Sequence, residues 1–160
     1  MYICLMRHGK AEPYSTTKED KDRELIEKGR NQVRTMAQAA LHWWPDGIVS
    51  IWSSPYVRAQ QTAAIWEEQI SPAAVNIHQA IADGDLETVY RDILCHDTSD
   101  VICLVGHAPY LNEWVKRWTG TEIDFKTGSA ALLDFDVHDG KVGSASVLCY
   151  IQPKGAALFH

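Results

Sequence analysis

The stretch Tyr2-Ile3-Cys4-Leu5-Met6-Arg7-His8-Gly9 joins an apolar run of strand length to a short cationic loop. An uninterrupted apolar run is typical of a strand that is buried on both faces of a parallel sheet. Ligands of open α/β sheets bind outside the carboxyl ends of the strands, which is where Arg7-His8-Gly9 falls. A guanidinium binds anions, an imidazole can act as a nucleophile, and glycine lets backbone approach closely. The stretch therefore indicates a site for an anion such as phosphate, although the three residues alone also fit a solvated turn with one salt bridge.

Length and composition indicate one soluble globular domain. The chain has 160 residues, which is within the ~100–200 residues of a usual domain, and we expect a single domain over residues 1–160. Hydrophobic residues make up 46% of the chain and charged residues 22%, which excludes a disordered or fibrous protein. The net charge of −6 argues against nucleic acid and against a membrane surface as partners.

Targeting signals and metal-binding patterns are absent from the sequence. No apolar stretch approaches the roughly 18–20 residues that span a bilayer, and the chain starts without a basic region or cleavage site, so we expect a cytoplasmic protein. The cysteines show no CxxC spacing and three of them lie in apolar runs, as expected of reduced core residues. They are Cys4, Cys95, Cys103 and Cys149. The histidines show no ligand spacing either, so neither zinc nor another cofactor is expected.

Strand-length apolar runs alternate with helix-like segments, which predicts a three-layer α/β sandwich with a mainly parallel central sheet. The parallel strands are expected at 2–6, 48–53, 75–78 and 101–105. Two later runs, Ala130–Val137 and Ala145–Gln152, flank His138-Asp139-Gly140-Lys141, in which Asp-Gly is a strong hairpin signal. We therefore expect two antiparallel strands at one edge of the sheet.

Two helices are predicted in the first half of the chain. Residues 27–41 carry helical periodicity, and Trp43-Trp44-Pro45-Asp46-Gly47 is typical of a packed turn after such a helix. Ser54 and Pro55 predict the start of the next helix, with Ser54 as the N-cap and Pro55 in the first helical position.

Further signals predict two more helices and a loop. Asp85 is expected to cap a helix over about 86–95, and Pro109 to begin one that Gly120 ends. The polar segment Pro13–Asp22 follows the first strand closely, so we expect a mobile loop that borders the site.

Cationic or titratable groups follow three of the predicted parallel strands. They are Arg7-His8, then Arg58 in the first turn of the helix after the second strand, and then Gly106-His107-Ala108-Pro109. Arg58 alone also fits a helix-surface charge, and His107 alone fits an ordinary loop histidine. At one sheet edge, however, two guanidiniums and two imidazoles would leave positive charge uncompensated unless an anion lay among them. We therefore expect a four-residue phosphate pocket.

Taken together, these motifs resemble the histidine phosphatase superfamily, whose fold is phosphoglycerate-mutase-like. The resemblance is carried by the strand that ends in Arg7-His8-Gly9, by the stretch Ser53–Ala63 (SSPYVRAQQTA) and by Val105-Gly106-His107. Arg23–Arg30 (RELIEKGR) also resembles the family's turn into its first helix. The similarity spans residues 2–109 and is greatest to the small SixA-type phosphohistidine phosphatases.

The resemblance implies a metal-independent reaction through a covalent phosphohistidine. A neutral His8 would attack phosphorus in line, and water would then hydrolyse the intermediate. Arg7, Arg58 and His107 would hold the non-bridging oxygens, and Gly9 would admit the backbone and orient His8 through a carbonyl.

A general acid in this family is typically a carboxylate after the third strand. Asp83 is the first choice there and Asp85 the second, although an N-cap role explains Asp85 fully. Asp20 and Asp22, in the loop after the nucleophile, are further alternatives. Because an imidazole with a pKa near ~6.5 leaves readily once protonated, a weak acid position favours phosphohistidine over alkyl phosphates.

The expected function is therefore that of a phosphatase acting on phosphohistidine in a partner protein, such as a phosphotransfer protein of a signalling or sugar-uptake relay. A broad phosphomonoesterase for small phosphoesters is the second interpretation, and a non-catalytic phosphate-binding module the third. Mutase activity needs a closed pocket that excludes water, whereas 160 residues leave no room for a capping insertion, and we expect an open site. The sequence does not predict the oligomeric state.

Overall fold

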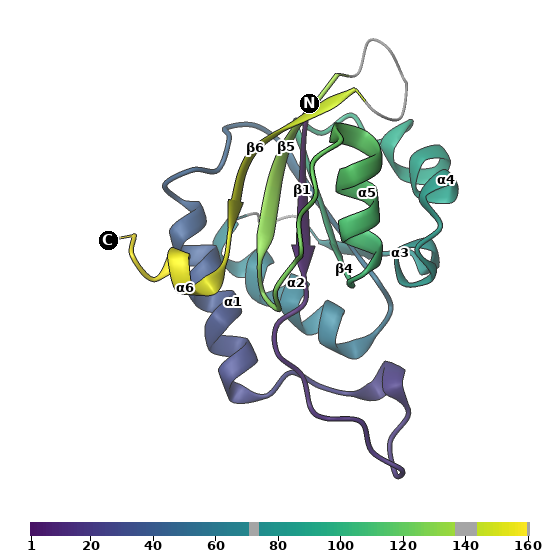
Figure 1. The fold of residues 1–160 in the computed structure, drawn as a ribbon, viewed down its shortest axis with the longest axis vertical. Coiled ribbons are helices and arrows are strands. Elements are labelled where there is room, and N and C mark those ends of the chain that lie inside the picture. Colours follow the sequence, from purple (N-terminus) through teal and green to yellow (C-terminus); the bar gives the residue numbers. More distant parts are fainter. Residues whose placement is uncertain (71–73, 137–143, 160) are drawn as a thin grey trace.

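The computed structural model describes residues 1–70, 74–136 and 144–159. Six strands form one mixed sheet in the order β3-β2-β4-β1-β5-β6 (Figure 1). They are β1 (Tyr2–Arg7), β2 (Val49–Ser53), β3 (Val75–Ile77), β4 (Val101–Gly106), β5 (Ala130–Phe135) and β6 (Ala145–Ile151). The first four in chain order pair in parallel, whereas β5 is antiparallel to both β1 and β6. The predicted α/β class, the parallel core and the antiparallel edge are all confirmed, and every strand lies within two residues of its predicted bounds.

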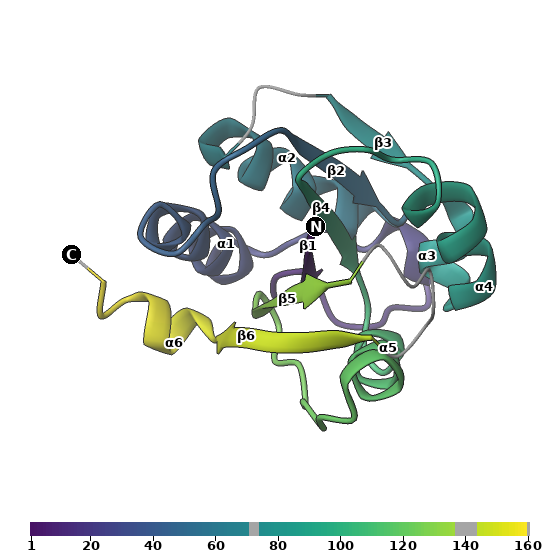
Figure 2. The same cartoon turned by 90° about the horizontal axis from the view of Figure 1, so that it is seen from above.

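The helices cover both faces of the sheet (Figure 2). One face carries α1 (Glu27–Ala40), α2 (Val57–Ile70) and the short α6 (Pro153–Ala156). The other face carries α3 (Gln79–Asp83), α4 (Leu86–Val89), the π-helical turn η2 (Tyr90–Leu94) and α5 (Tyr110–Thr119). The 3-10 turn η1 (Asp20–Asp22) lies in the long loop after β1.

The core lies in two layers, because each central strand is buried on both sides. In β1, Ile3 and Leu5 face the layer of α3, α4 and α5, whereas Cys4 and Met6 face α1 and α2. All four side chains are fully buried, which explains why the strand shows no polar alternation. The turn after α1 packs as predicted, since Trp43 and Trp44 lie against one another and against Trp66.

Most of the predicted helix ends are confirmed. Asp85 accepts a hydrogen bond from the Thr88 amide and caps α4, which continues into η2 rather than forming one regular helix over 86–95. Gly120 ends α5 in the left-handed conformation, with φ of 76°. Pro109 is the N-cap residue of α5 rather than its first helical residue.

The predicted start of α2 is wrong by two residues. The helix begins at Val57, and the Tyr56 carbonyl accepts the amides of Ala59 and Gln60. Ser54 does bind the Tyr56 amide through its hydroxyl, but Pro55 lies before the helix. The Ser54 side chain is engaged by a residue distant in sequence, His107, so it does not cap α2 as the local sequence suggests.

Three further predictions concern the hairpin turn, the cysteines and membrane-spanning segments. The predicted turn residues His138-Asp139-Gly140-Lys141 lie outside the described residues, and β5 and β6 pair with one another in antiparallel orientation. The four cysteines are unpaired; Cys4 and Cys103 are buried, Cys149 is half-buried and Cys95 is exposed. Within the described ranges, no helix is long and apolar enough to cross a membrane.

Candidate active site

The carboxyl ends of β1, β2 and β4 bring the predicted site residues together. Arg7 lies beside Gly106 in the register of β1 and β4, and Ser53 lies beside Val105 in that of β2 and β4. As a result the rings of His8 and His107 lie 5.3 Å apart between centroids. Arg58 reaches the same point from the first turn of α2. The predicted convergence of the three strand ends is therefore observed.

His8 is held as a neutral imidazole with one defined tautomer. Its Nδ1 lies 2.7 Å from the Gly9 carbonyl oxygen, which can only accept, so Nδ1 carries the proton. Its Nε2 accepts a hydrogen bond of 3.3 Å from Nε of Arg58, which can only donate. Burial lowers the pKa of His8 to about 3, and the positive charges of Arg58 and Arg7 act in the same direction. At neutral pH the Nε2 lone pair is thus available beside two guanidiniums.

The peptide of Gly9 is fixed from the opposite side by α2. The Gly9 amide donates to Oγ1 of Thr62, and the Thr62 hydroxyl donates to the Arg58 carbonyl at 2.8 Å. A Cβ at residue 9 would lie 2.7 Å from the Gly29 carbonyl oxygen, so α1 approaches too closely for any other residue. The orientation of His8 therefore depends on both helices of this face.

Arg58 is held by the loop after β1. The residue is 5% exposed, its Nη1 donates to the Asp20 carbonyl oxygen at 2.8 Å, and its Nη2 lies 3.4 Å from Asp20 Oδ2. Arg23 in turn pairs with Asp20 through Nε at 2.8 Å. The predicted loop Pro13–Asp22 thus lies against Arg58 through Asp20.

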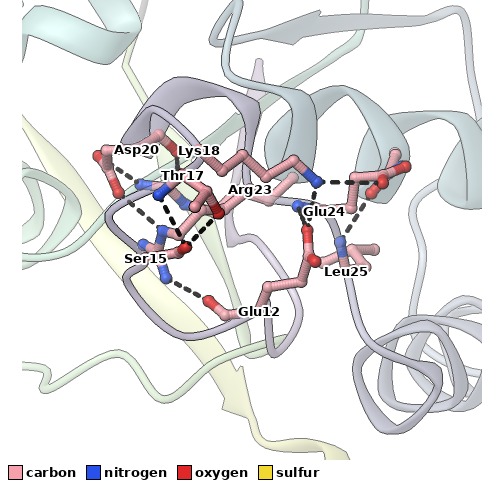
Figure 3. A network of polar contacts seen from close by, with 10 residues as sticks. Glu12, Ser15, Thr17, Lys18, Asp20, Arg23, Glu24 and Leu25 are labelled. Atoms are coloured by element: carbon pink, nitrogen blue, oxygen red, sulfur yellow. Dashed lines mark hydrogen bonds and ion pairs between the residues drawn. The ribbon is translucent and has the colours of Figure 1, made fainter.

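Further polar contacts connect this loop to itself (Figure 3). Lys18 forms ion pairs with Glu12 at 2.8 Å and with Glu24 at 3.3 Å, and the Glu24 amide donates to the Glu12 carboxylate. Arg23 also donates to the Glu12 carbonyl. These ion pairs and hydrogen bonds thus hold the loop in the position from which Asp20 meets Arg58.

His107 is the second neutral ring of the site. It is 7% exposed, and burial together with the nearby charge of Arg58 lowers the pKa of His107 to about 4. Its Nε2 lies 2.8 Å from the Ser54 hydroxyl. The Tyr56 ring packs edge-on against the His107 ring, with 5.0 Å between the two centroids. No described residue forms a hydrogen bond with Nδ1 of His107.

Arg7 is anchored at one end only. Its Nη1 donates to the Phe125 carbonyl oxygen at 2.6 Å, and the Phe125 amide is itself held by Asn112. Its buried Nε has no hydrogen-bond partner in the described part of the chain. Buried donors without partners are rare in folded proteins, and an oxyanion at this position would satisfy one.

The candidate acids differ in their relation to the four predicted pocket residues Arg7, His8, Arg58 and His107. Asp83 is the last residue of α3, where its exposed carboxylate accepts from Gln79 at 3.0 Å. Asp85 binds the amide and the hydroxyl of Thr88, and these hydrogen bonds lower the pKa of its carboxyl. Asp22 is exposed on η1. Among the hydrogen bonds and ion pairs of the described residues, Asp20 alone of the four joins Arg7, His8, Arg58 or His107.

Asp20 is held in its ionised form. Burial by itself would raise the pKa of this carboxyl, but the hydrogen bond from Arg23 and the positive charge of Arg58 outweigh it and hold the pKa below its ordinary value. A carboxylate in this state accepts hydrogen bonds and does not supply a proton near neutral pH.

Three supporting groups were not assigned to the site by sequence reasoning. Thr62 lies in the motif that carried the resemblance, but its spacing gave no indication of the contact with Gly9. Ser54 was interpreted as a cap only. The Phe125 carbonyl, which holds Arg7, has no sequence signal because any residue supplies one.

The fold and the site define an α/β protein with two histidines and two arginines gathered at the carboxyl edge of its sheet. No three His, Cys, Asp or Glu side chains are grouped to hold a metal ion in the part of the chain that the structure describes. The family model of the histidine phosphatase superfamily (branch 1) matches residues 3–92. The chain belongs to this superfamily.

Solved structures show the same fold. The protein histidine phosphatase SixA in complex with tungstate has a TM-score of 0.81 at 22% identity, with 96% of this chain and 98% of that chain covered. A putative phosphohistidine phosphatase SixA from Agrobacterium tumefaciens gives a TM-score of 0.80 at 22% identity, covering 95% and 97%. Phosphoserine phosphatase from Entamoeba histolytica, in complex with 3-phosphoglyceric acid, gives 0.65 at 14% identity, covering 98% and 99%. No curated protein sequence matches the chain.

Proposed function

We propose that this protein is a metal-independent phosphatase that removes phosphate from phosphohistidine in a partner protein. The observation that carries the proposal is the state of His8. This neutral ring donates a hydrogen bond from Nδ1 to the Gly9 carbonyl oxygen, and its Nε2 lone pair faces Arg58. A ring in this state is ready to attack phosphorus without first losing a proton.

The reaction proceeds in two steps. Nε2 of His8 forms a bond to phosphorus while the bond from phosphorus to the substrate imidazole breaks, and that imidazole leaves with a proton from solvent. Water then attacks phosphorus, the bond from phosphorus to Nε2 of His8 breaks, and inorganic phosphate and the neutral ring of His8 are released. Arg7, Arg58 and His107 surround the position of the transferring group, where donors stabilise the charge on its three outer oxygens. Arg58 exchanges its hydrogen bond to Nε2 for one to a phosphoryl oxygen as substrate enters.

The carboxylates favour phosphohistidine as the substrate. Asp20 contacts Arg58 but is held ionised, and Asp83 is hydrogen-bonded on its own helix. An alkoxide leaving group needs a proton donor, whereas imidazole with its ordinary pKa near ~6.5 does not need one from the protein. Asp83 is the residue we propose as acid for any phosphoester turnover, because α3 packs against the strand that leads to His107. Ile81 of that helix lies beside Gly106.

The experiment is a comparison of substrates with the intact protein. Phosphohistidine-bearing phosphotransfer proteins, phosphoserine and p-nitrophenyl phosphate are each incubated with the protein in the presence and absence of a chelator. We expect phosphohistidine to be turned over fastest, with no effect of the chelator. Faster turnover of the small phosphoesters would favour the broad phosphomonoesterase. Binding of phosphorylated proteins without release of phosphate would favour the non-catalytic module.

Two parts of the proposal concern the setting of the reaction. We propose a cytoplasmic location and a single domain over residues 1–160, which fit a relay that works on soluble phosphotransfer proteins. Fractionation of the native cell and limited proteolysis of the purified chain test these two statements.

A further inference from the structure

The buried hydroxyl of Ser54 lies between a backbone amide and the ring of His107. Its oxygen accepts the Tyr56 amide at 3.2 Å, and it lies 2.8 Å from Nε2 of His107. Ser54 is fully buried, so water does not complete its hydrogen bonds. The direction of the bond between hydroxyl and ring decides which nitrogen of His107 carries the proton.

The two possible assignments differ in how many buried groups they leave without a hydrogen-bond partner. A hydroxyl has one proton to donate and an oxygen that accepts. If Nε2 donated to Ser54, the hydroxyl proton would be left in a buried position with no acceptor among the described residues, and a buried donor without a partner is unfavourable. If Ser54 donates to Nε2, the hydrogen bonds run from the Tyr56 amide to Ser54 and on to His107, and only Nδ1 of His107 lacks a partner among the described residues. In that case Nδ1 of His107 carries the proton.

The proton on Nδ1 decides whether His107 can bind an oxyanion. Because burial keeps this ring neutral near pH 7, only one of its two nitrogens is a donor. Nδ1 is the nitrogen without a hydrogen-bond partner in the described part of the chain. With the proton there, His107 offers a donor, and with the proton on Nε2 it would offer a lone pair that repels a phosphoryl oxygen.

We propose that Ser54 is a positioning residue that fixes His107 as the Nδ1–H tautomer, so that a neutral ring can donate to the transferring phosphoryl group. Ser54 itself touches no substrate and acts through the ring. The proposal rests on the proposed function only for its consequence in catalysis, since the tautomer is a property of the unliganded protein.

Ser53 provides a matched control. It is the neighbouring residue, it is also fully buried, and its hydroxyl donates to the Ser54 carbonyl oxygen at 2.8 Å rather than to a ring of the site. The variant Ser53→Ala thus removes a buried hydroxyl of the same strand end and leaves the contact with His107 in place. The variant Ser54→Thr keeps the hydroxyl and serves as the rescue.

The test is nitrogen NMR of the whole protein with labelled histidine rings, with the His107 signals assigned from the variant His107→Asn. We expect Nδ1 of His107 to be protonated in the unmodified protein, in Ser53→Ala and in Ser54→Thr, and Ser54→Ala to show an increased share of the Nε2–H form. The turnover number of Ser54→Ala on phosphohistidine is expected to fall by about 10-fold or more, by analogy with the loss of one oxyanion donor.

Two results would overturn the proposal. One is an Nε2–H ring in the unmodified protein, and the other is an unchanged tautomer in a folded Ser54→Ala variant. Absence of phosphatase activity in the unmodified protein would instead refute the proposed function, and the tautomer measurement would still stand or fall by itself.

Discussion

Acid should destabilise this protein in a way that can be traced to two rings. His8 and His107 are buried and neutral in the folded state, with pKa values of about 3 and about 4. In the unfolded chain both rings return to an ordinary pKa of about 6.5. Between these values the unfolded state binds protons that the folded state does not, so the free energy of unfolding falls as the pH decreases below ~6.5.

The size of the effect follows from the proton linkage. Each ring that protonates only on unfolding costs about 1.4 kcal/mol per pH unit below its unfolded pKa. Lowering the pH from about 7.5 to about 5.0 therefore removes about 2 kcal/mol for one ring and about 4 kcal/mol for both. Most carboxylates keep their charge over this interval, because their ordinary pKa values lie near or below ~4.3.

Urea unfolding at a series of pH values measures this dependence, and the variant His107→Asn isolates one ring. The six other histidines, His8 among them, contribute equally to both proteins, so the difference in pH dependence belongs to His107 alone. We expect the variant to lose about 2 kcal/mol less than the unmodified protein between the two pH values. An equal pH dependence of the free energy of unfolding in the two proteins would show that His107 titrates normally in the fold. That result would refute the claim that its buried ring is held neutral.

Three substitutions test the geometry of the site, each through purified, folded variants. Thr62→Val leaves the buried Gly9 amide without its acceptor, so we expect the free energy of unfolding in urea to fall by about 1–3 kcal/mol and turnover to become slower. Thr62→Ser should keep most of the stability and most of the activity. Equal stability of the Val and Ser variants would contradict the role of the hydroxyl. The ammonium introduced by Arg58→Lys cannot reproduce the guanidinium fork that contacts His8 and Asp20. Steady-state kinetics should therefore show about 10²–10³-fold lower turnover. Near-normal activity would exclude Arg58 from oxyanion binding. Asp83→Asn should abolish turnover of phosphoserine and largely spare phosphohistidine in parallel assays, and equal losses on the two substrates would contradict the assignment of the acid.

The fold could be predicted because the ends of its strands are marked by residue types that indicate a loop or turn from the local sequence alone. Tyr2–Met6 and Val101–Val105 are apolar throughout since both faces of the sheet are covered, and each strand ends one residue later, at Arg7 and at Gly106. The convergence of Arg7, His8 and His107 could be predicted from the topology, because neighbouring parallel strands place Arg7 and Gly106 side by side.

The rest depended on contacts between segments distant in sequence. Ser54 has the local chemistry of a helix cap, and only the folded chain shows that its hydroxyl meets His107. Asp20 and Asp22 are equivalent in sequence, yet the 3-10 turn directs one toward Arg58 and leaves the other exposed. The contact of Thr62 with Gly9 spans 53 positions and has no periodicity to indicate it.

Trapping of phosphate on His8 is the most direct test of the central claim. The protein is mixed with a phosphotransfer protein that carries labelled phosphohistidine, quenched in alkali within the first turnover, and analysed by mass spectrometry of its peptides. We predict label on the peptide that contains His8, lost in the variant His8→Ala and released as inorganic phosphate when quenching is delayed. Turnover of the substrate with no label on His8 at any time would contradict a covalent mechanism through this ring.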